Sequence, residues 1–263
     1  MDFIHFFIFL DIMSLFDEKI KNVSLVELLA LFIVLCIMMF GFNYFNIKYS
    51  STILYLIILA YFMFKLRNSF NELKIEFLNV FSRVSFKTIG YVVLLNIFFS
   101  YGMLYFSNSI LHVVDSNSIF GSFMSLNVGL FGIGGFLSVV LLSPVVEELI
   151  FRGIFLNKLK IIVPTAFAIL ISSLLFASLH GFGSIFSSFI FAICMALFYL
   201  KSENILVPIF AHFLNNLIGE SIYHLDSSQI LFNNDLVVGA MSVLAIISFI
   251  LILKFIYSNW NNV

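Results

Sequence analysis

Two adjacent carboxylates and an arginine, Glu147, Glu148 and Arg152, interrupt a run that otherwise consists of Leu, Val, Ile and Phe. Charged side chains in such an apolar stretch are costly in a membrane and indicate a functional site. Glu148 and Arg152 are four residues apart, so a helix places them one turn apart on one face, where they can pair. Glu147 points away from that face. The spacing predicts that Arg152 neutralises Glu148 and fixes this helix, while Glu147 is available for chemistry.

Two later apolar segments carry polar side chains at the same helical spacing. Phe176 and His180 share one face of the first segment, and His212 and Asn216 share one face of the second. Polar residues in lipid face the interior of a helix bundle or a water-filled cavity. If the three segments converge, a carboxylate, two imidazoles and a carboxamide line one buried cavity, which Phe176 helps to support.

Such a set of groups can hydrolyse an amide bond. Desolvated Glu147 could take a proton from a water molecule that His180 helps to hold. His212 and Asn216 could donate hydrogen bonds to the oxyanion that develops on the substrate carbonyl. Because no Ser or Cys beside a base suggests a covalent nucleophile, water is the favoured attacking group.

The same residues leave the question of a metal open. Glu147, His180 and His212 supply one carboxylate and two imidazoles, the ligand set of some catalytic zinc sites. The sequence has no H-E-x-x-H pattern, in which one helix supplies two ligands and a base. We favour a water activated by glutamate with no obligatory cofactor, and zinc held by these three residues is the alternative.

The composition predicts an all-α, polytopic membrane helix bundle. Of the 263 residues, 62% are apolar, 18% are aromatic and 10% are charged, whereas a soluble domain is roughly a quarter charged. A span needs about twenty apolar residues. We expect eight spans, at 26–45, 52–66, 88–107, 130–155, 161–180, 184–200, 205–220 and 236–257. Residues 1–16 are expected to form an amphipathic segment, and residues 67–87 an interfacial one.

Basic residues predict the orientation, because cytoplasmic loops are enriched in Lys and Arg. With a cytoplasmic N-terminus, eleven of the thirteen basic residues fall on the cytoplasmic side, namely Lys19, Lys21, Lys65, Arg67, Lys74, Arg83, Lys87, Lys158, Lys160, Lys201 and Lys254. The predicted external segments 108–125 and 221–235 contain no Lys or Arg. An even number of spans then places both termini in the cytoplasm. The abundance of Phe, Ile, Asn and Lys suggests a bacterial plasma membrane.

Glu147-Glu148-x-x-x-Arg152, Phe176-x-x-x-His180 and His212-x-x-x-Asn216, in this order, resemble the three motifs of the CAAX-protease and bacteriocin-processing (CPBP, or Abi) family of intramembrane endopeptidases. That family includes the eukaryotic CAAX prenyl protease 2 and proteins like lysostaphin resistance protein A. The resemblance covers about 136–220. It implies hydrolysis of peptide bonds within or at the membrane, with Glu147 and His180 as the catalytic pair. It also implies that His212 and Asn216 stabilise the transition state.

The resemblance divides the chain into N-terminal helices without a family signature, 1–125, and a catalytic core with a final span, 126–263. The expected partners are the lipid bilayer and a membrane-embedded or membrane-associated peptide or protein substrate, and no nucleic acid. Bacteriocin or peptide maturation and self-immunity are the roles considered. The alternatives are a non-catalytic immunity or scaffold protein that binds a partner through the same polar cavity, and an ion or small-solute permease.

One geometric question follows from the helix positions. If a straight helix begins near Pro164, His180 lies at its external end while Glu147 lies nearer the middle of its own span. At 1.5 Å per residue the difference in depth is on the order of 10 Å. The elbow at 158–164 and the glycines upstream of Pro144 would allow the helices to bend.

Overall fold

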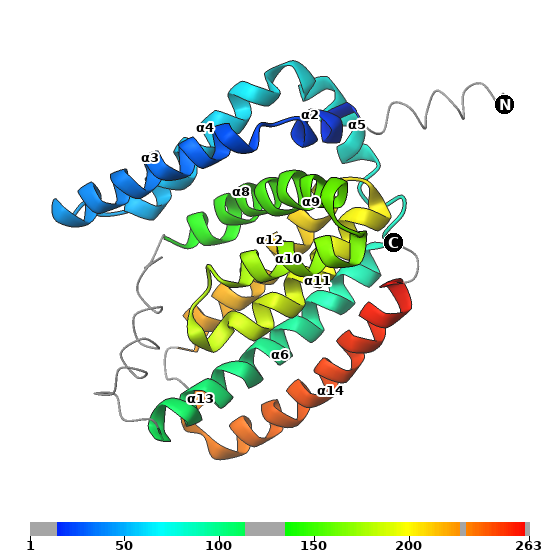
Figure 1. Cartoon of the computed structure of the whole chain (residues 1–263). Coiled ribbons are helices and arrows are strands. Elements are labelled where there is room, and N and C mark those ends of the chain that lie inside the picture. Colours follow the sequence, from blue (N-terminus) through cyan, green and yellow to red (C-terminus); the bar gives the residue numbers. More distant parts are fainter. Residues whose placement is uncertain (1–14, 114–134, 227–229, 261–263) are drawn as a thin grey trace.

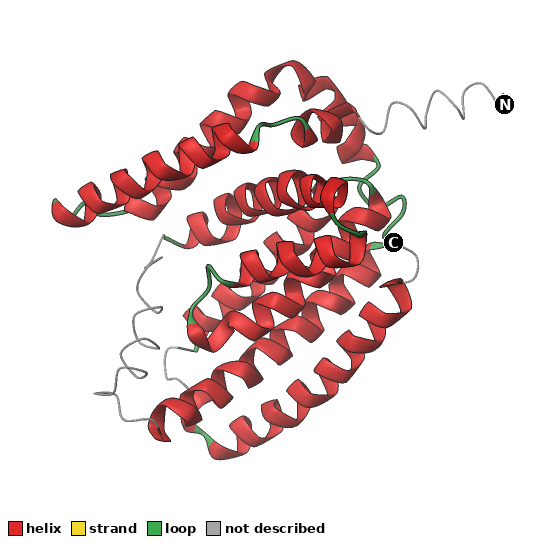
Figure 2. Ribbon diagram, viewed as in Figure 1, coloured by secondary structure: helices red, strands yellow, loops and turns green. Residues whose placement is uncertain are grey.

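The computed structural model describes residues 15–113, 135–226 and 230–260, and these residues form helices joined by short loops, with no strand among them (Figure 2). The predicted all-α membrane bundle is therefore correct. The amphipathic segment expected at 1–16 lies almost entirely outside the described residues.

The N-terminal part consists of short helices around a long hairpin. Its elements are α2 (Leu15–Lys21), α3 (Leu25–Tyr44), α4 (Ser50–Leu66), the 3₁₀ turn η1 (Arg67–Ser69) and α5 (Phe70–Leu78). The α3–α4 hairpin lies across one side of the bundle (Figure 1). Many exposed side chains of α3 are large and apolar, among them Leu29, Phe32 and Phe40, as expected of a surface that faces lipid.

The remaining elements build the bundle. They are α6 (Phe86–Val113), η2 (Ser138–Leu142), α8 (Ser143–Glu148), η3 (Leu149–Leu156), α9 (Asn157–Ile162), α10 (Thr165–Ala177), η4 (Phe182–Ser184), α11 (Ile185–Ser202), α12 (Leu206–Leu225), α13 (Ile230–Asn233) and α14 (Asp235–Trp260). From the hairpin across to the opposite side of the bundle, the order in space is α8–α9, then α10 to α12, then α6, and finally α14 (Figure 1).

Helix α11 is the centre of the packing. All of its residues from Ile190 to Tyr199 are buried, and they contribute to the core on both sides. One core lies among α6, α11, α12 and α14, and the other lies among α2, α4, η3, α10 and α11. On the outer side of the first core, α6 and α14 approach closely because Gly102 lacks a Cβ, which would overlap Ala245.

The expected count of eight spans is not confirmed. Within the described ranges, five helices are long and apolar enough to cross a membrane, at 25–44, 50–69, 86–107, 185–202 and 235–260. The expected span 161–180 corresponds to α10, which has only 13 residues. The expected span 205–220 corresponds to α12, whose 20 residues include His212, Asn215, Asn216 and Glu220 and are therefore less apolar. The expected span 130–155 begins in residues that are not described.

Two carboxylates are buried where α2 and α5 meet the end of α11. Asp17 and Glu76 are only 2% and 4% exposed. Asp17 Oδ1 and both oxygens of Glu76 have no hydrogen-bond partner within the described part of the chain. Burial raises the pKa of Asp17 to about 7. Burial and the neighbouring Asp17 raise the pKa of Glu76 to about 8. Both groups therefore favour the protonated form in the folded protein.

We expect the stability of the detergent-solubilised protein to fall as pH rises from about 4 to about 8. In this window the folded chain retains protons on Asp17 and Glu76 that the unfolded chain has released, so the free energy of unfolding decreases with pH. The double change Asp17→Asn and Glu76→Gln should flatten this dependence and raise Tm at pH 9 by roughly 5 °C. Thermal unfolding at pH 5, 7 and 9 measures it, with exposed Glu18→Gln as the control. A Tm of the wild-type protein that rises between pH 5 and pH 8 would contradict the prediction.

Candidate active site

The two adjacent carboxylates stand on a continuous helix, 138–162, in which the π-helical segments η2 and η3 flank α8. In a π segment each carbonyl accepts from the N–H five residues later, as the Ser138 carbonyl does from Ser143. The carbonyl of Val139 would need the N–H of Pro144, which proline lacks. Asn216 on α12 supplies the missing donor, with its Nδ2 at 2.9 Å from the Val139 oxygen. The proline thus creates the acceptor that ties α12 to this helix.

Side chains also donate hydrogen bonds to backbone carbonyls of the second π segment, η3. Ser172 on α10 donates to the carbonyl of Phe151 at 3.1 Å. The Asn157 amide donates to the carbonyls of Arg152 and Gly153 at 3.0 Å and 2.9 Å. Because an unpaired backbone carbonyl is costly away from water, these donors allow the wide turns to exist within the bundle.

Glu148 and Arg152 form the ion pair that their spacing predicts. Arg152 donates from Nη1 to Glu148 Oε1 at 2.9 Å, and the two side chains are 1% and 0% exposed. The guanidinium also donates to the Ala192 carbonyl on α11 at 3.1 Å. It lies 4.6 Å from the centroid of the Phe176 ring, a cation–π contact between two buried side chains. One buried charge therefore links three helices.

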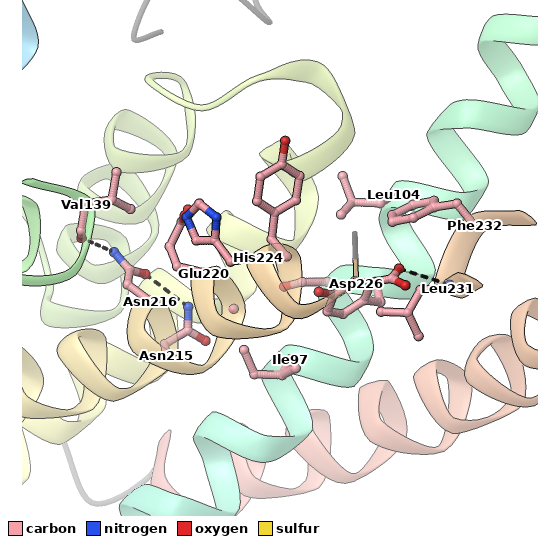
Figure 3. Close-up of a pocket in the computed structure, with 14 residues that line it drawn as sticks. Ile97, Leu104, Val139, Asn215, Asn216, Glu220, His224, Asp226, Leu231 and Phe232 are labelled. Carbon is pink, nitrogen blue, oxygen red and sulfur yellow. Dashed lines mark hydrogen bonds and ion pairs between the residues drawn. The ribbon is translucent and has the colours of Figure 1, made fainter. Parts of the chain in front are cut away.

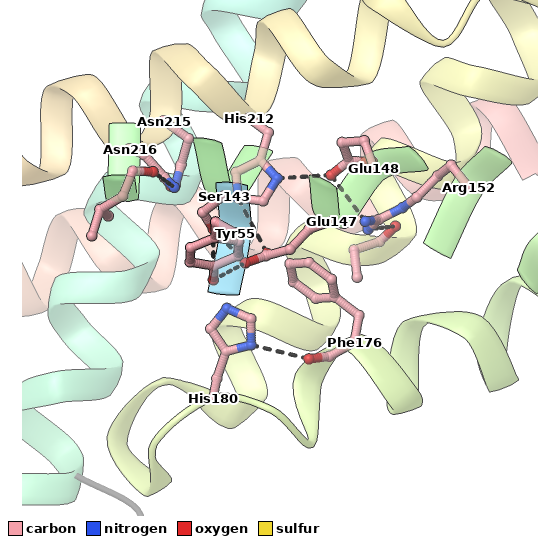
Figure 4. A network of polar contacts seen from close by, with 12 residues as sticks. Tyr55, Ser143, Glu147, Glu148, Arg152, Phe176, His180, His212, Asn215 and Asn216 are labelled. Carbon is pink, nitrogen blue, oxygen red and sulfur yellow. Dashed lines mark hydrogen bonds and ion pairs between the residues drawn. The ribbon is translucent and has the colours of Figure 1, made fainter. Parts of the chain in front are cut away.

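His212 joins the same carboxylate from α12. Its Nδ1 lies 2.8 Å from Glu148 Oε1. Since a carboxylate accepts, this contact keeps a proton on Nδ1 and leaves Nε2 of the neutral ring as an acceptor. Nε2 lies 4.0 Å from Glu147 Oε2 (Figure 4). Glu148 thus orients the ring of His212 toward Glu147.

Glu147 is the less buried carboxylate, with 16% of its side chain exposed. Its Oε1 accepts a hydrogen bond from Tyr55 on α4 at 3.0 Å and another from Ser143, one turn earlier on its own helix. These two donors occupy Oε1. The other oxygen, Oε2, faces His212 and remains available to a ligand.

His180 lies just beyond the end of α10, which stops at Ala177. Its Nδ1 is 3.0 Å from the carbonyl of Phe176, and its ring lies 4.7 Å from the Phe176 ring. A carbonyl accepts, so Nδ1 carries the proton and Nε2 of the neutral ring is again an acceptor. His180 is directed toward Glu147 (Figure 4), and its charged neighbours include Glu147 and Arg152. The difference in depth expected for a straight helix from Pro164 therefore does not separate His180 from Glu147.

Asn216 is held by a chain of hydrogen bonds between amide side chains. Asn96 on α6 donates to Asn215 Oδ1 at 2.8 Å, and Asn215 donates to Asn216 Oδ1 at 3.3 Å. Only one of the two hydrogens on Asn216 Nδ2 is needed for the bond to Val139, so the amide retains a second donor. The structure thus brings Glu147, Glu148, Arg152, Phe176, His180 and His212 together, with Asn216 one helical turn from His212.

Three polar neighbours of the site were not predicted from the sequence. Ser143 could have been found, because it lies four residues before Glu147 and so shares its helical face. Asn96 could also have been found, since a lone amide inside an apolar span marks a polar contact. Tyr55 gives no local signal, because it lies 92 residues before Glu147 in a separate hairpin.

Glu147, His180 and His212 are residue types that bind zinc, but their side chains are not close enough together to hold it. His180 and His212 each hold a proton on Nδ1 through an oxygen acceptor, which is how metal-ligating histidines present Nε2. Among the described residues, however, no three His, Cys, Asp or Glu side chains lie close enough together to hold a metal ion. We therefore derive no step of the chemistry through a metal.

Removal of Arg152 should destabilise the fold because it leaves Glu148 as an uncompensated buried charge. We expect Arg152→Met to cost about 3–5 kcal/mol, measured by thermal or denaturant unfolding in detergent. The double variant Glu148→Gln and Arg152→Met should recover most of that loss, since Gln still accepts from His212 without a charge. Losses that simply add in the double variant would contradict the role of this ion pair.

Residues 128–218, about a third of the chain, match the family model described as Type II CAAX prenyl endopeptidase Rce1-like. No curated protein and no solved structure matches the chain. The matched segment contains all the residues on which the resemblance was based, from Glu147 to Asn216. The match of this segment supports membership of the chain in the CAAX-protease (CPBP) family of intramembrane endopeptidases.

Proposed function

We propose that this membrane protein hydrolyses a peptide bond with a water molecule activated by Glu147. The observation that carries the proposal is the 4.0 Å separation of Glu147 Oε2 and His212 Nε2 within an apolar bundle. Two acceptors at this distance can share one water at about 2.8 Å from each. Such a water directs its hydrogens at the two acceptors and its lone pair at a substrate carbonyl.

In the proposed reaction Glu147 takes one proton from the water as its oxygen attacks the carbonyl carbon. The C–N bond then breaks, and the same proton passes to the leaving amine. Tyr55 and Ser143 hold Oε1 so that Oε2 performs this transfer. His180, whose neutral ring presents Nε2 as an acceptor, is proposed to position the water with Glu147.

The oxyanion needs donors, and Asn216 is proposed to supply one through the second hydrogen on its Nδ2. His212 is proposed as the other donor when its ring carries two protons. In that form its Nε2 donates to the oxyanion, and Glu147 and His180 alone hold the water. Glu148 would stabilise that form, because its Oε1 lies 2.8 Å from Nδ1. Preorganised donors of this kind are usually the largest contribution to acyl-transfer catalysis.

We propose a membrane-associated peptide or protein as the substrate, with maturation of a secreted peptide or self-immunity to one as the biological role. We further propose that both termini are cytoplasmic, on the basis of the distribution of Lys and Arg. Residues 1–125 are proposed to govern substrate access, since Tyr55 on α4 lies against Glu147.

The change Glu147→Gln tests the proposal directly. It keeps the shape and removes the base, so we expect cleavage to fall at least about a hundredfold with little change in Tm. The measurement is mass spectrometry of a panel of membrane-inserted peptides incubated with the protein in liposomes. His180→Ala should also lose cleavage, whereas exposed Glu18→Gln should retain it.

The same assay distinguishes the competing mechanisms. Full activity after treatment with a chelator is expected of glutamate-activated water, whereas loss on chelation and recovery on added zinc would reverse that part of the proposal. Undiminished biological function in both Glu147→Gln and His180→Ala would favour a non-catalytic scaffold.

Tyr55→Phe tests whether the N-terminal hairpin contributes to the site. The variant loses one hydrogen bond to a charged group, so we expect kcat to fall about tenfold while KM stays within about twofold. Tyr44→Phe, at a position 82% exposed on α3, is the matched control. An unchanged kcat would show that the contact with Glu147 has no part in turnover.

A further inference from the structure

A cavity of about 580 Å³ lies between α6, α12 and α13 (Figure 3). Its volume is within the range of about 300–1,000 Å³ that is typical of ligand sites. The residues of its lining that matter here are Tyr101, Asn216, Glu220, His224, Asp226 and Phe232.

The cavity adjoins the candidate active site at Asn216. Asn216 and Val139, which are hydrogen-bonded to each other, both line it. Glu220 follows Asn216 by one turn of α12, and His212 precedes Asn216 by one turn. From His212 to Glu220 the helix rises about 12 Å. An extended peptide covers that distance with roughly three or four residues.

The charge of the cavity is negative. Glu220 and Asp226 contribute carboxylates, and the sequence has no Lys or Arg in 88–151 or 202–253, the stretches that supply its described lining. Among those lining residues, only His224 can carry a positive charge, and its Nε2 lies 3.7 Å from Glu220 Oε2. A cation is therefore attracted to this cavity and an anion is repelled.

Glu220 is the carboxylate that a ligand can use. Asp226 is already occupied, because its oxygens accept the backbone N–H groups of Ile230 and Leu231 at 2.8 Å and 3.0 Å. Within the described ranges the one polar partner of the Glu220 carboxylate is His224, and 31% of the Glu220 side chain is exposed. Glu220 can therefore rotate to meet an incoming group.

The rest of the lining suits the stem of a long basic side chain. Tyr101 and Phe232 form an aromatic pair with ring centroids 6.2 Å apart. Lys and Arg bury their methylene stems on apolar surface while the charged end reaches a polar partner, and aromatic faces attract the cation.

We propose that this cavity is a specificity subsite for a Lys or Arg side chain of the substrate, three or four residues from the scissile bond, with Glu220 as its partner. The assignment of a subsite rests on the proposed endopeptidase function. The preference for a basic side chain rests on the cavity alone.

The test uses binding, so that it does not depend on turnover. The Glu147→Gln protein in detergent is titrated into fluorescein-labelled twelve-residue peptides of Leu, Ala and Ser that carry Lys, Gln or Glu at position six, and fluorescence anisotropy is measured. We expect the Lys peptide to bind about tenfold more tightly than the Gln peptide, as a hydrogen-bonded charge would require. When Glu220→Gln is added to the Glu147→Gln protein, the difference in affinity between the two peptides should disappear. When Glu18→Gln is added instead, the difference should be unchanged.

A charge-reversal variant distinguishes the loss of the subsite from a folding defect. Glu220→Lys in the same background should prefer the Glu peptide, a gain that a misfolded protein cannot show. Equal binding of the Lys and Gln peptides by the Glu147→Gln protein, including no binding of either, would overturn the subsite. A Glu220-dependent preference without cleavage by the wild-type protein would instead overturn the proposed function and leave the basic-side-chain site standing.

Discussion

Glu148 Oε1 accepts from Arg152 on its own helix and from His212 on α12, at 2.9 Å and 2.8 Å. A buried carboxylate without partners would destabilise the bundle by several kcal/mol, and the two donors together offset this cost. Arg152 then reaches α11 through the Ala192 carbonyl and α10 through the Phe176 ring. This one shared oxygen thus connects the helix that carries Glu147 to α12 directly, and through Arg152 to α10 and α11.

The constraint also explains why adjacent glutamates have different surroundings. Glu148 is fully buried and bonded to two cationic or titratable groups, whereas Glu147 is partly exposed and bonded to two hydroxyls. Hydroxyl donors hold a carboxylate in place without adding positive charge beside it. Rotation by about 100° between neighbouring helical residues is sufficient to place Glu148 in the buried ion pair and Glu147 at the partly exposed position.

Much of the site could be predicted because helical spacing is local information. The pairing of Glu148 with Arg152 and the shared faces of the other two motifs needed no knowledge of tertiary structure. The contact of Tyr55 with Glu147 could not be predicted, because it joins the hairpin to the bundle across 92 residues. The count of eight spans is not confirmed for a related reason: α10 has only 13 residues, and α12 carries several polar side chains. The tautomers of His180 and His212 depend on backbone and side-chain oxygens that only the folded chain brings near.

The wide turn at 138–142 has a consequence for how this chain tolerates changes in length. A π segment is equivalent to one residue inserted into an α-helix. Deletion of a single residue between 139 and 144 could be absorbed by a return to ordinary winding, which leaves the parts of the helix on either side in nearly the same relative orientation. Glu147 would then stay near the hydroxyl of Tyr55, and the Val139 carbonyl would still face Pro144 and still need the donor from Asn216. The segment is therefore a place where the chain can lose one residue without turning the helix that carries Glu147.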